Sequence, residues 1–245
     1  MADYRFYLDR LLTKKKQQIE FIEGNVIQTP GITGALVDAP KLSQSVWTVE
    51  FWIKLDRVDA IQFLFTERQT SSSSTWNYYI AYVPSFQSYL MEYYNSSGEN
   101  MGVVELSNVI IANTWYHIAI SFDNINQKIN SWLNGELFLN NLNMPAPMNQ
   151  ALGVTRFFRF SYLNLHPMYG KFTDLRVWNH VRTTTQIQAN RCIRLKGNES
   201  GLIRYYKFDE IINTNIIEDK STNGLDATVT RPDLFSFVDE PKLCS

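Results

Sequence analysis

Short runs of alternating apolar side chains constrain the fold of this chain more than any other feature. In residues 46–55, VWTVEFWIKL, every second side chain is strongly apolar, and residues 116–122 show the same pattern. A period of two residues is typical of a β-strand that buries one face. We expect the other face of residues 46–55, which carries Thr48, Glu50 and Lys54, to meet water or a partner.

Many further runs of this kind predict a chain that is mostly strand. They are short, rich in β-branched and aromatic residues, and cover 61–67, 76–83, 87–94, 101–106, 157–162, 171–178 and 202–208. Asn134-Gly135 predicts a tight turn, and Ser71–Ser74 and Asn95–Gly98 predict hairpin loops. Because each sheet must bury one face on another, ten or more such strands imply an antiparallel sandwich.

Helix is scarce in this reading. Thr183–Thr185 offers an N-cap for one short helix near 185–191. The N-terminal stretch YRFYLDRLLTKKKQQ fits a helix or a strand with a charged turn, and we favour helix or irregular structure. The chain of 245 residues shows neither an internal repeat nor a Pro/Gly-rich linker. We therefore expect one domain over 19–245, preceded by an N-terminal extension over 1–18.

Charge and hydropathy exclude two classes of partner. A formal net charge of −1 gives no electrostatic basis for binding nucleic acid, which needs clustered positive charge. No apolar run approaches the roughly 18 residues of a membrane helix. The first ten residues, MADYRFYLDR, do not resemble a signal peptide. We expect synthesis in the cytoplasm, with release or incorporation into a particle as later fates.

The two cysteines, Cys192 and Cys244, leave two alternatives open. A disulfide between them would close a long loop and contribute about 4 kcal/mol in the chain-entropy model. In a reducing cell they would remain two free thiols. We favour the free thiols.

Four segments in a fixed order resemble a known family. They are VWTVEFWIKLD (46–56), NTWYHIAISFDNINQKINSWLNGEL (113–137), YGKFTDLRVWNHVRTTTQIQAN (169–190) and the GLIRYYKFDE…STNGLDATV region (201–229). Together they resemble the concanavalin A-like lectin/glucanase superfamily in its laminin-G-like branch, over about residues 19 to 230. The resemblance implies an all-β fold, an antiparallel jelly-roll β-sandwich.

Several residues of these segments have a packing explanation. Trp115 and Trp132 lie on neighbouring strands of the predicted hairpin, and we expect them to pair across it. Asp174 and Arg176 share a strand face, so they are expected to form an ion pair. The histidines, His117, His166 and His180, are too scattered for a zinc site, and no H-E-x-x-H is present. We interpret His117 as a satisfied strand residue.

The sequence argues against an enzyme. Glucanases of the same fold class carry an E-x-D-x-x-E strand motif that places carboxylates in one cleft, and this sequence lacks it. The adjacent pair Asp209-Glu210 would point to opposite faces of a strand. No G-x-S-x-G occurs, so a hydrolase nucleophile elbow is unsupported. We predict no catalytic residue.

Calcium is the one metal for which the sequence offers ligands. The candidate residues are Asp209, Asp219 and Asn223, because calcium takes carboxylate and amide oxygens and many relatives bind it at a loop rim. The alternative is that these short side chains, with Ser221, hydrogen-bond the backbone of a crossing loop. We favour the loop, with no cofactor required.

Aromatic residues beside the predicted loops are the candidate ligand contacts. Rings at loop edges stack on sugars or anchor protein surfaces, whereas rings inside a sandwich are core. The candidates are Trp76, Tyr78, Tyr79, Tyr93 and Tyr94. Met144 and Met148 lie in a proline-containing loop and are expected to pack over a sheet opening.

These features favour a non-catalytic recognition module. It would bind carbohydrate or a protein surface through its rim loops. The alternative is a structural or assembly subunit of a virion, an inclusion or a toxin complex, as a homo- or hetero-oligomer. A glucanase-type hydrolase is a third and weaker alternative.

Overall fold

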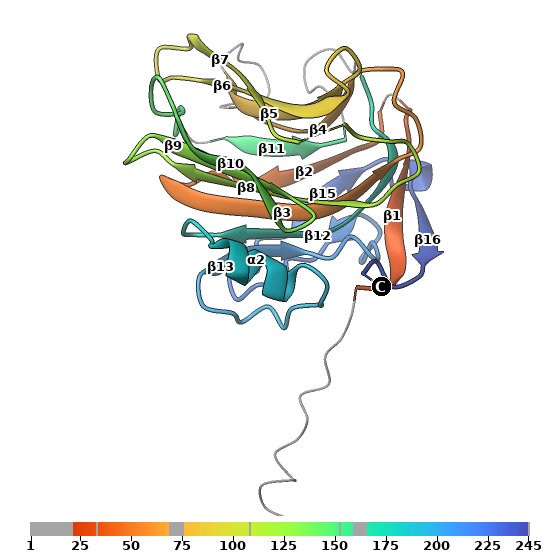
Figure 1. Ribbon diagram of the computed structural model, residues 1–245. Helices are drawn as coiled ribbons and strands as arrows, with labels where there is room; N and C mark the ends of the chain where they lie inside the picture. Colours follow the sequence, from red (N-terminus) through yellow and green to blue (C-terminus); the bar gives the residue numbers. More distant parts are fainter. Residues whose placement is uncertain are drawn as a thin grey trace, which may run out of the picture.

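The chain folds into two stacked antiparallel sheets, as the sequence predicts (Figure 1). The computed structural model describes residues 22–32, 34–68, 76–107, 109–151, 153–158 and 166–244. The predictions for the N-terminal extension and for the Ser71–Ser74 loop lie outside these residues. The all-β jelly-roll prediction is confirmed, whereas the boundary at residue 18 stays a prediction.

The first sheet has the strand order β10-β9-β8-β3-β12-β1-β16, and β13 also pairs with β12. Its strands are β1 (Gly24–Pro30), β3 (Val46–Leu55), β8 (Tyr116–Asp123), β9 (Lys128–Leu133), β10 (Glu136–Asn143), β12 (Tyr169–Trp178), β13 (Leu202–Tyr206) and β16 (Ser236–Glu240). The predicted tight turn joins β9 to β10, where Asn134 and Gly135 have φ values of 53° and 84°. Two consecutive positive φ values are those of a type I′ hairpin turn.

The second sheet has the order β14-β15-β2-β11-β4-β5-β6-β7. Its strands are β2 (Leu36–Pro40), β4 (Gln62–Arg68), β5 (Trp76–Val83), β6 (Ser88–Tyr94), β7 (Asn100–Glu105), β11 (Val154–Phe157), β14 (Ile216–Ile217) and β15 (Ala227–Thr230). Of the strand predicted over 157–162, Phe157 is the last residue of β11 and Phe158 lies just after it, while residues 159–162 lie outside the described part of the chain. A single turn of 3-10 helix, η1 (Pro232–Leu234), precedes β16.

Rings from both sheets interlock in the core. Phe51 of β3 stacks on Phe172 of β12 at 5.1 Å and meets Phe65 of β4 edge-on at 5.5 Å. Such pairs stabilise beyond the apolar area they bury. Met144 and Met148 are also buried, so their predicted packing over the sandwich is confirmed.

The predicted short helix is α2 (Thr184–Asn190), one residue earlier than expected. Thr183 is its N-cap and forms a capping box with Gln186, so two backbone N–H groups at the helix start are bonded. The helix lies below β12 and β13 in Figure 1. No helix among the described residues is long and apolar enough to cross a membrane.

The outward face of β3 is buried, contrary to the expectation that it meets water or a partner. Thr48 and Glu50 are fully buried and Trp52 is 3% exposed. Thr48 Oγ1 donates to the carbonyl of His180 at 2.7 Å, and Trp52 Nε1 donates to that of Arg191 at 2.7 Å. The prediction is wrong because residues 179–195 fold back over this face and supply polar partners.

Ion pairs neutralise the charges under this cover. Arg182 donates to Glu50 at 2.6 Å, and Trp178 Nε1 donates to the same oxygen at 2.7 Å. Burial disfavours ionisation of Glu50, but hydrogen bonding to His117 and the charges of Arg176 and Arg182 outweigh it and lower the pKa of Glu50 to about 2. A buried carboxylate is tolerable when it is paired in this way.

A β-bulge in β12 completes the network. The register against β3 shifts between Thr173 and Arg176, and Asp174 has a φ of 59°. The bulge brings Asp174 onto Arg176, which confirms the predicted ion pair. The Tyr205 hydroxyl donates to Asp174 at 2.7 Å.

His117 lies in the same buried layer. Its Nε2 is 3.4 Å from Oε2 of Glu50, and its Nδ1 has no hydrogen-bond partner among the described residues. Burial lowers the pKa of His117 more than Glu50 raises it. The imidazole is a buried strand residue, as predicted, but only part of its hydrogen-bonding capacity is used.

The preference for free thiols is wrong: Cys192 and Cys244 form a disulfide with a Cα–Cα distance of 5.6 Å. Cys192 follows α2, and backbone bonds join Ile22 N to Cys192 O and Leu243 N to Ile22 O. The start of β1, the end of α2 and the C-terminal segment therefore lie side by side. This juxtaposition comes from sheet topology, which the spacing of two cysteines does not reveal.

Trp115 and Trp132 do not pair, contrary to expectation. Trp132 lies opposite Ala119, and its Nε1 donates to Thr184 at the start of α2 at 2.9 Å. Trp115 precedes β8, and its Nε1 donates to Glu240 at 3.0 Å. Trp115 lies four residues before Ala119, so the two rings are too far apart along the strands to pair.

Candidate functional site

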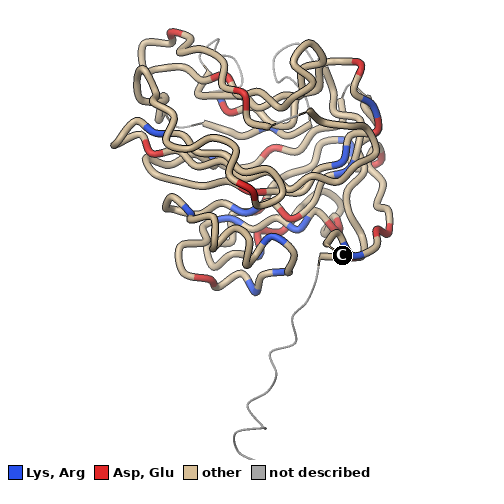
Figure 2. Tube along the Cα trace, in the orientation of Figure 1, with Lys and Arg blue, Asp and Glu red and all other residues tan. Residues whose placement is uncertain are grey.

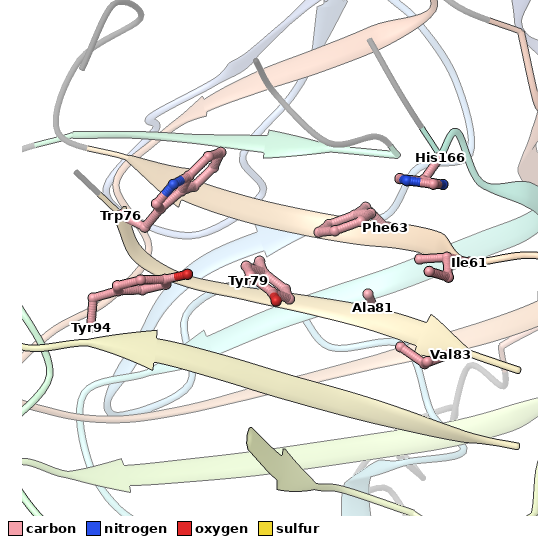
Figure 3. Close-up of a pocket in the computed structure, with 8 residues that line it drawn as sticks. All are labelled: Ile61, Phe63, Trp76, Tyr79, Ala81, Val83, Tyr94 and His166. Carbon is pink, nitrogen blue, oxygen red and sulfur yellow. The ribbon is translucent and has the colours of Figure 1, made fainter. Parts of the chain in front are cut away.

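An aromatic hollow opens on the face of the second sheet that is turned away from the core (Figure 3). Its volume is about 280 Å³. The strands β4, β5 and β6 and the two segments before β4 and β12 supply its lining, which consists of Ile61, Phe63, Trp76, Tyr79, Ala81, Val83, Tyr94 and His166.

Strand alternation places the β5 and β6 side chains. In β5, Tyr79 faces outward, whereas Tyr78 is fully buried in the core against Trp47 and Phe65. In β6, Tyr94 faces outward and Tyr93 is 1% exposed. The predictions for Tyr78 and Tyr93 as ligand contacts are therefore wrong, because neighbouring residues of a strand point to opposite faces.

A β-bulge turns Trp76 toward the hollow. Trp76 and Tyr78 are two residues apart and would share a face in a regular strand. The register between β4 and β5 shifts between Glu67 and Arg68, so Asn77 and Tyr78 both face inward while Trp76 faces out. Three of the five predicted aromatic residues, Trp76, Tyr79 and Tyr94, thus lie around one hollow.

One carboxylate orients both tyrosines. The hydroxyl groups of Tyr79 and Tyr94 donate to the two oxygens of Glu92, the second at 2.5 Å. Asn100 also donates to Glu92, at 2.5 Å. Burial and this carboxylate raise the pKa of Tyr79 and of Tyr94 well above 10, so both phenols remain protonated donors at neutral pH.

Neighbouring groups hold the other rings. The guanidinium carbon of Arg68 lies 4.5 Å from the centre of the Trp76 ring. Phe63 lies 5.0 Å from Tyr79 and 5.9 Å from His166, measured between ring centres. Rings fixed in this way lose little conformational entropy on binding a ligand.

Sequence reasoning missed Phe63, Ala81 and His166 as parts of this site. Phe63 lies opposite Ala81 only because the β4–β5 register shifts between Phe63 and Phe65. His166 arrives from the segment before β12, and its backbone carbonyl accepts from Phe63 N at 3.0 Å. Hydrophobic periodicity within one segment carries no signal for such pairings.

The candidate calcium residues do not form one ligand set. Oδ1 of Asp219 accepts the backbone N–H groups of Tyr205 and Ser221, and Oδ2 accepts that of Leu225. The amide of Asn223 donates to Ile203 O at 2.9 Å. Among the described residues, no group of three or more His, Cys, Asp or Glu could hold a metal.

Asp209 instead lies in a separate polar hollow of about 330 Å³. Its lining is Glu23, Asn25, Arg194, Asp209 and Glu210. Asp209 and Glu210 follow β13 outside any strand, so the expectation that they point to opposite faces is wrong. Arg194 is joined to Asp174 at 3.5 Å and to Glu23 O at 3.3 Å, which ties this hollow to the buried network.

A known protein family matches most of this chain. The family profile of the concanavalin A-like lectin/glucanases superfamily, of the laminin G type, matches residues 30–188. The chain belongs to this superfamily. The match confirms the resemblance seen in the sequence. No curated protein matches the chain in sequence.

Solved structures share the fold of this superfamily member. A Bacteroides ovatus protein proposed to bind carbohydrate has a TM-score of 0.66 at 16% identity, covering 89% of this chain and 60% of its own length. The heptameric SAP-like pentraxin of Limulus polyphemus has a TM-score of 0.57 at 16% identity, and the match covers 91% of this chain and 98% of the pentraxin chain. A leech intramolecular trans-sialidase has a TM-score of 0.50 at 16% identity, and the match covers 72% of this chain and 29% of the trans-sialidase chain. At these identities the likeness shows the fold alone.

Proposed function

We propose that the chain is a non-catalytic module that binds carbohydrate in the aromatic hollow. The observation that carries this proposal is the gathering of Trp76, Tyr79 and Tyr94 around one space of sugar-ring scale. A sugar ring has apolar C–H faces, which stack on aromatic rings, and hydroxyl groups at its edge. The fold shared with a Bacteroides ovatus protein proposed to bind carbohydrate supports this choice.

The hollow offers recognition without the groups for hydrolysis. Cleavage of a glycosidic bond needs two carboxyl groups on either side of it. Among the described residues that line the hollow, none is acidic, and nearby Glu92 already accepts from Tyr79, Tyr94 and Asn100. We therefore expect no activity on β-glucans, and hydrolysis above background would favour the glucanase alternative.

A glycan array followed by calorimetry on a bound glycan tests the proposal. Trp76→Ala removes a stacking face and is expected to weaken binding roughly 10- to 100-fold, as loss of a binding hot spot does. Phe86→Ala is the matched control, because Phe86 is an aromatic residue 54% exposed in the β5–β6 turn. Unchanged binding by Trp76→Ala, or binding to no glycan at all, would contradict the proposal.

We also propose that binding needs no calcium. The oxygens of Asp219 are occupied by backbone N–H groups, and Asn223 bonds the carbonyl of Ile203. The same array with EDTA in place of calcium is expected to give the same profile. A profile that collapses with EDTA and returns with calcium would restore the metal prediction.

An assembly subunit is the second candidate. Apolar side chains are exposed along edge strand β7 and just after it, with Val103 at 54%, Val109 at 57% and Ile111 at 61%. Exposed apolar groups beside an unpaired edge are typical of contact surfaces. Mass photometry over a range of concentrations tests this candidate, and a stable oligomer would support it.

A further inference from the structure

The aromatic hollow has two unlike halves (Figure 3). Trp76, Tyr79 and Tyr94 lie at one end. The hydroxyl groups of the two tyrosines donate to Glu92. The other end is apolar and is lined by Ile61, Phe63, Ala81 and Val83, with His166 beside them. A ligand that fills the whole hollow must therefore present a stacking face at one end and an apolar group at the other.

Ala81 gives the apolar half its depth. Its side chain is one methyl group at the centre of β5, 1% exposed and in register with Phe63 on β4. Figure 3 shows it between the longer side chains of Phe63, Tyr79 and Val83. A larger side chain at this position would fill the space that these neighbours surround.

The surrounding charges favour an uncharged ligand. None of the described lining residues carries a permanent charge, and two charged groups that contact the lining, Glu92 and Arg68, have opposite signs. Glu92 lies behind the tyrosines, and Arg68 stacks on Trp76. A carboxylate on the ligand would be repelled by Glu92, and an ammonium group by Arg68, so neither sign gains.

The volume favours a single sugar unit. At about 280 Å³, the hollow is at the lower end of the roughly 300–1,000 Å³ that ligand sites span. A chain of several rings would extend beyond the lining residues.

We infer that the hollow selects an uncharged sugar that carries a methyl group, an N-acetyl or a 6-deoxy sugar, with this methyl group over Ala81. The inference rests on the proposed function, since it names the ligand class of the same site. The ring would stack between Trp76 and Tyr94, and the methyl group would be buried against the apolar floor at Ala81 and Phe63.

Matched pairs of sugars test the inference by calorimetry on the full chain. N-acetylglucosamine against N-formylglucosamine tests the acetyl methyl, L-fucose against L-galactose tests the 6-deoxy methyl, and glucuronic acid against glucose tests charge. Burying one methyl group is worth about fourfold in affinity, so at least one methyl-bearing sugar is expected to bind about fourfold more tightly than its partner. Glucuronic acid is expected to bind no more tightly than glucose.

Variants locate this preference in the hollow. Ala81→Leu fills the floor, and Ile61→Ser makes its rim polar at a position that is 37% exposed and tolerant of change. Both are expected to reduce the methyl preference to less than about twofold. Ile125→Ser, at a site 73% exposed in the β8–β9 turn, is the control and should keep the preference.

The outcomes separate the inference from the proposed function. Equal affinity within both pairs that differ by a methyl group, or tighter binding of glucuronic acid than of glucose, would overturn the inference. If Trp76→Ala still abolished the binding of these sugars, the proposed function would remain intact. A preference that survives both Ile61→Ser and a folded Ala81→Leu would also overturn it. If no glycan binds the wild-type chain, the proposed function itself fails.

Discussion

The outward faces of the two sheets have opposite chemistry and opposite surroundings. On the first sheet, the alternating residues Thr48 and Glu50 are polar, yet they are buried beneath residues 179–195. On the second sheet, Trp76 and Tyr79 are aromatic, yet they are only partly buried and line an open hollow. Polarity alone would predict that the first face is exposed and that the second is buried.

The difference shows that burial depends on what lies opposite a face. Residues 179–195 bring Arg182 and Arg194 over the first sheet. These two residues and Tyr205 of β13 supply the charges and the hydroxyl that its carboxylates need. Over the hollow, the tyrosine hydroxyls are satisfied within the sheet by Glu92. A ligand can therefore meet the ring faces without breaking a bond.

Figure 2 shows how the charged residues are distributed along the described chain. Lysine, arginine, aspartate and glutamate are interspersed along the described chain, in keeping with its net charge of −1. Several of the basic residues near α2 are engaged in the buried network rather than forming a surface patch.

The largest expected effect comes from breaking the buried network. Glu50→Ala leaves Arg182 without its carboxylate partner and Arg176 with Asp174 alone, and should lower the free energy of unfolding by about 3–5 kcal/mol. Glu92→Ala, beside the partly exposed tyrosines, should cost about 1 kcal/mol. Urea denaturation of both variants measures the difference, and equal losses would refute the contrast.

Substitutions of two tryptophans, one on each face, test the same contrast for apolar side chains. Trp52→Ala removes a buried ring that bonds the carbonyl of Arg191 and should cost about 3–5 kcal/mol. Trp76→Ala removes a partly exposed ring and should cost about 1 kcal/mol or less. Thermal unfolding compares them, and a Tm loss as large for Trp76→Ala as for Trp52→Ala would place Trp76 among the core residues.

The disulfide should matter for the covered face and not for the hollow. Replacing Cys192 and Cys244 by serine frees the segment after α2 and should lower the free energy of unfolding by about 2–4 kcal/mol. Glycan binding by the folded variant should be unchanged. Loss of binding without loss of stability would link the two regions. The expectation of cytoplasmic synthesis stays a prediction.

A smaller effect concerns pH. Burial lowers the pKa of His117 below 6.5, so the unfolded chain binds a proton that the folded chain excludes. Stability should therefore fall as the pH drops below about 6.5. His117→Gln should flatten this part of the profile, and an unchanged slope would show that another group is responsible.

Much of the fold follows from local patterns. The period of two in residues 46–55 and 116–122 identified β3 and β8, Asn134-Gly135 identified the β9–β10 turn, and Thr183 identified the start of α2. Each signal acts within a few residues of the chain. Local steric preference and the burial of one face are enough to specify such elements.

The site was only partly predictable. Loop-edge aromatics pointed to the right strands, but the bulge at Asn77 decided that Trp76 and not Tyr78 faces the hollow. The same face received Phe63 and His166 from segments distant in the sequence. A one-residue shift reverses the side to which a strand residue points, and no composition rule reports it.

The sequence by itself determined the elements: which segments are strands, where one helix begins, and that two sheets share an apolar core. Only the tertiary structure decided which outward face is covered, that Cys192 meets Cys244, and which aromatic rings share one hollow. The reason is physical. Periodicity records the interactions of a residue with its neighbours along the chain, whereas register, bulges and crossover connections set its neighbours in space.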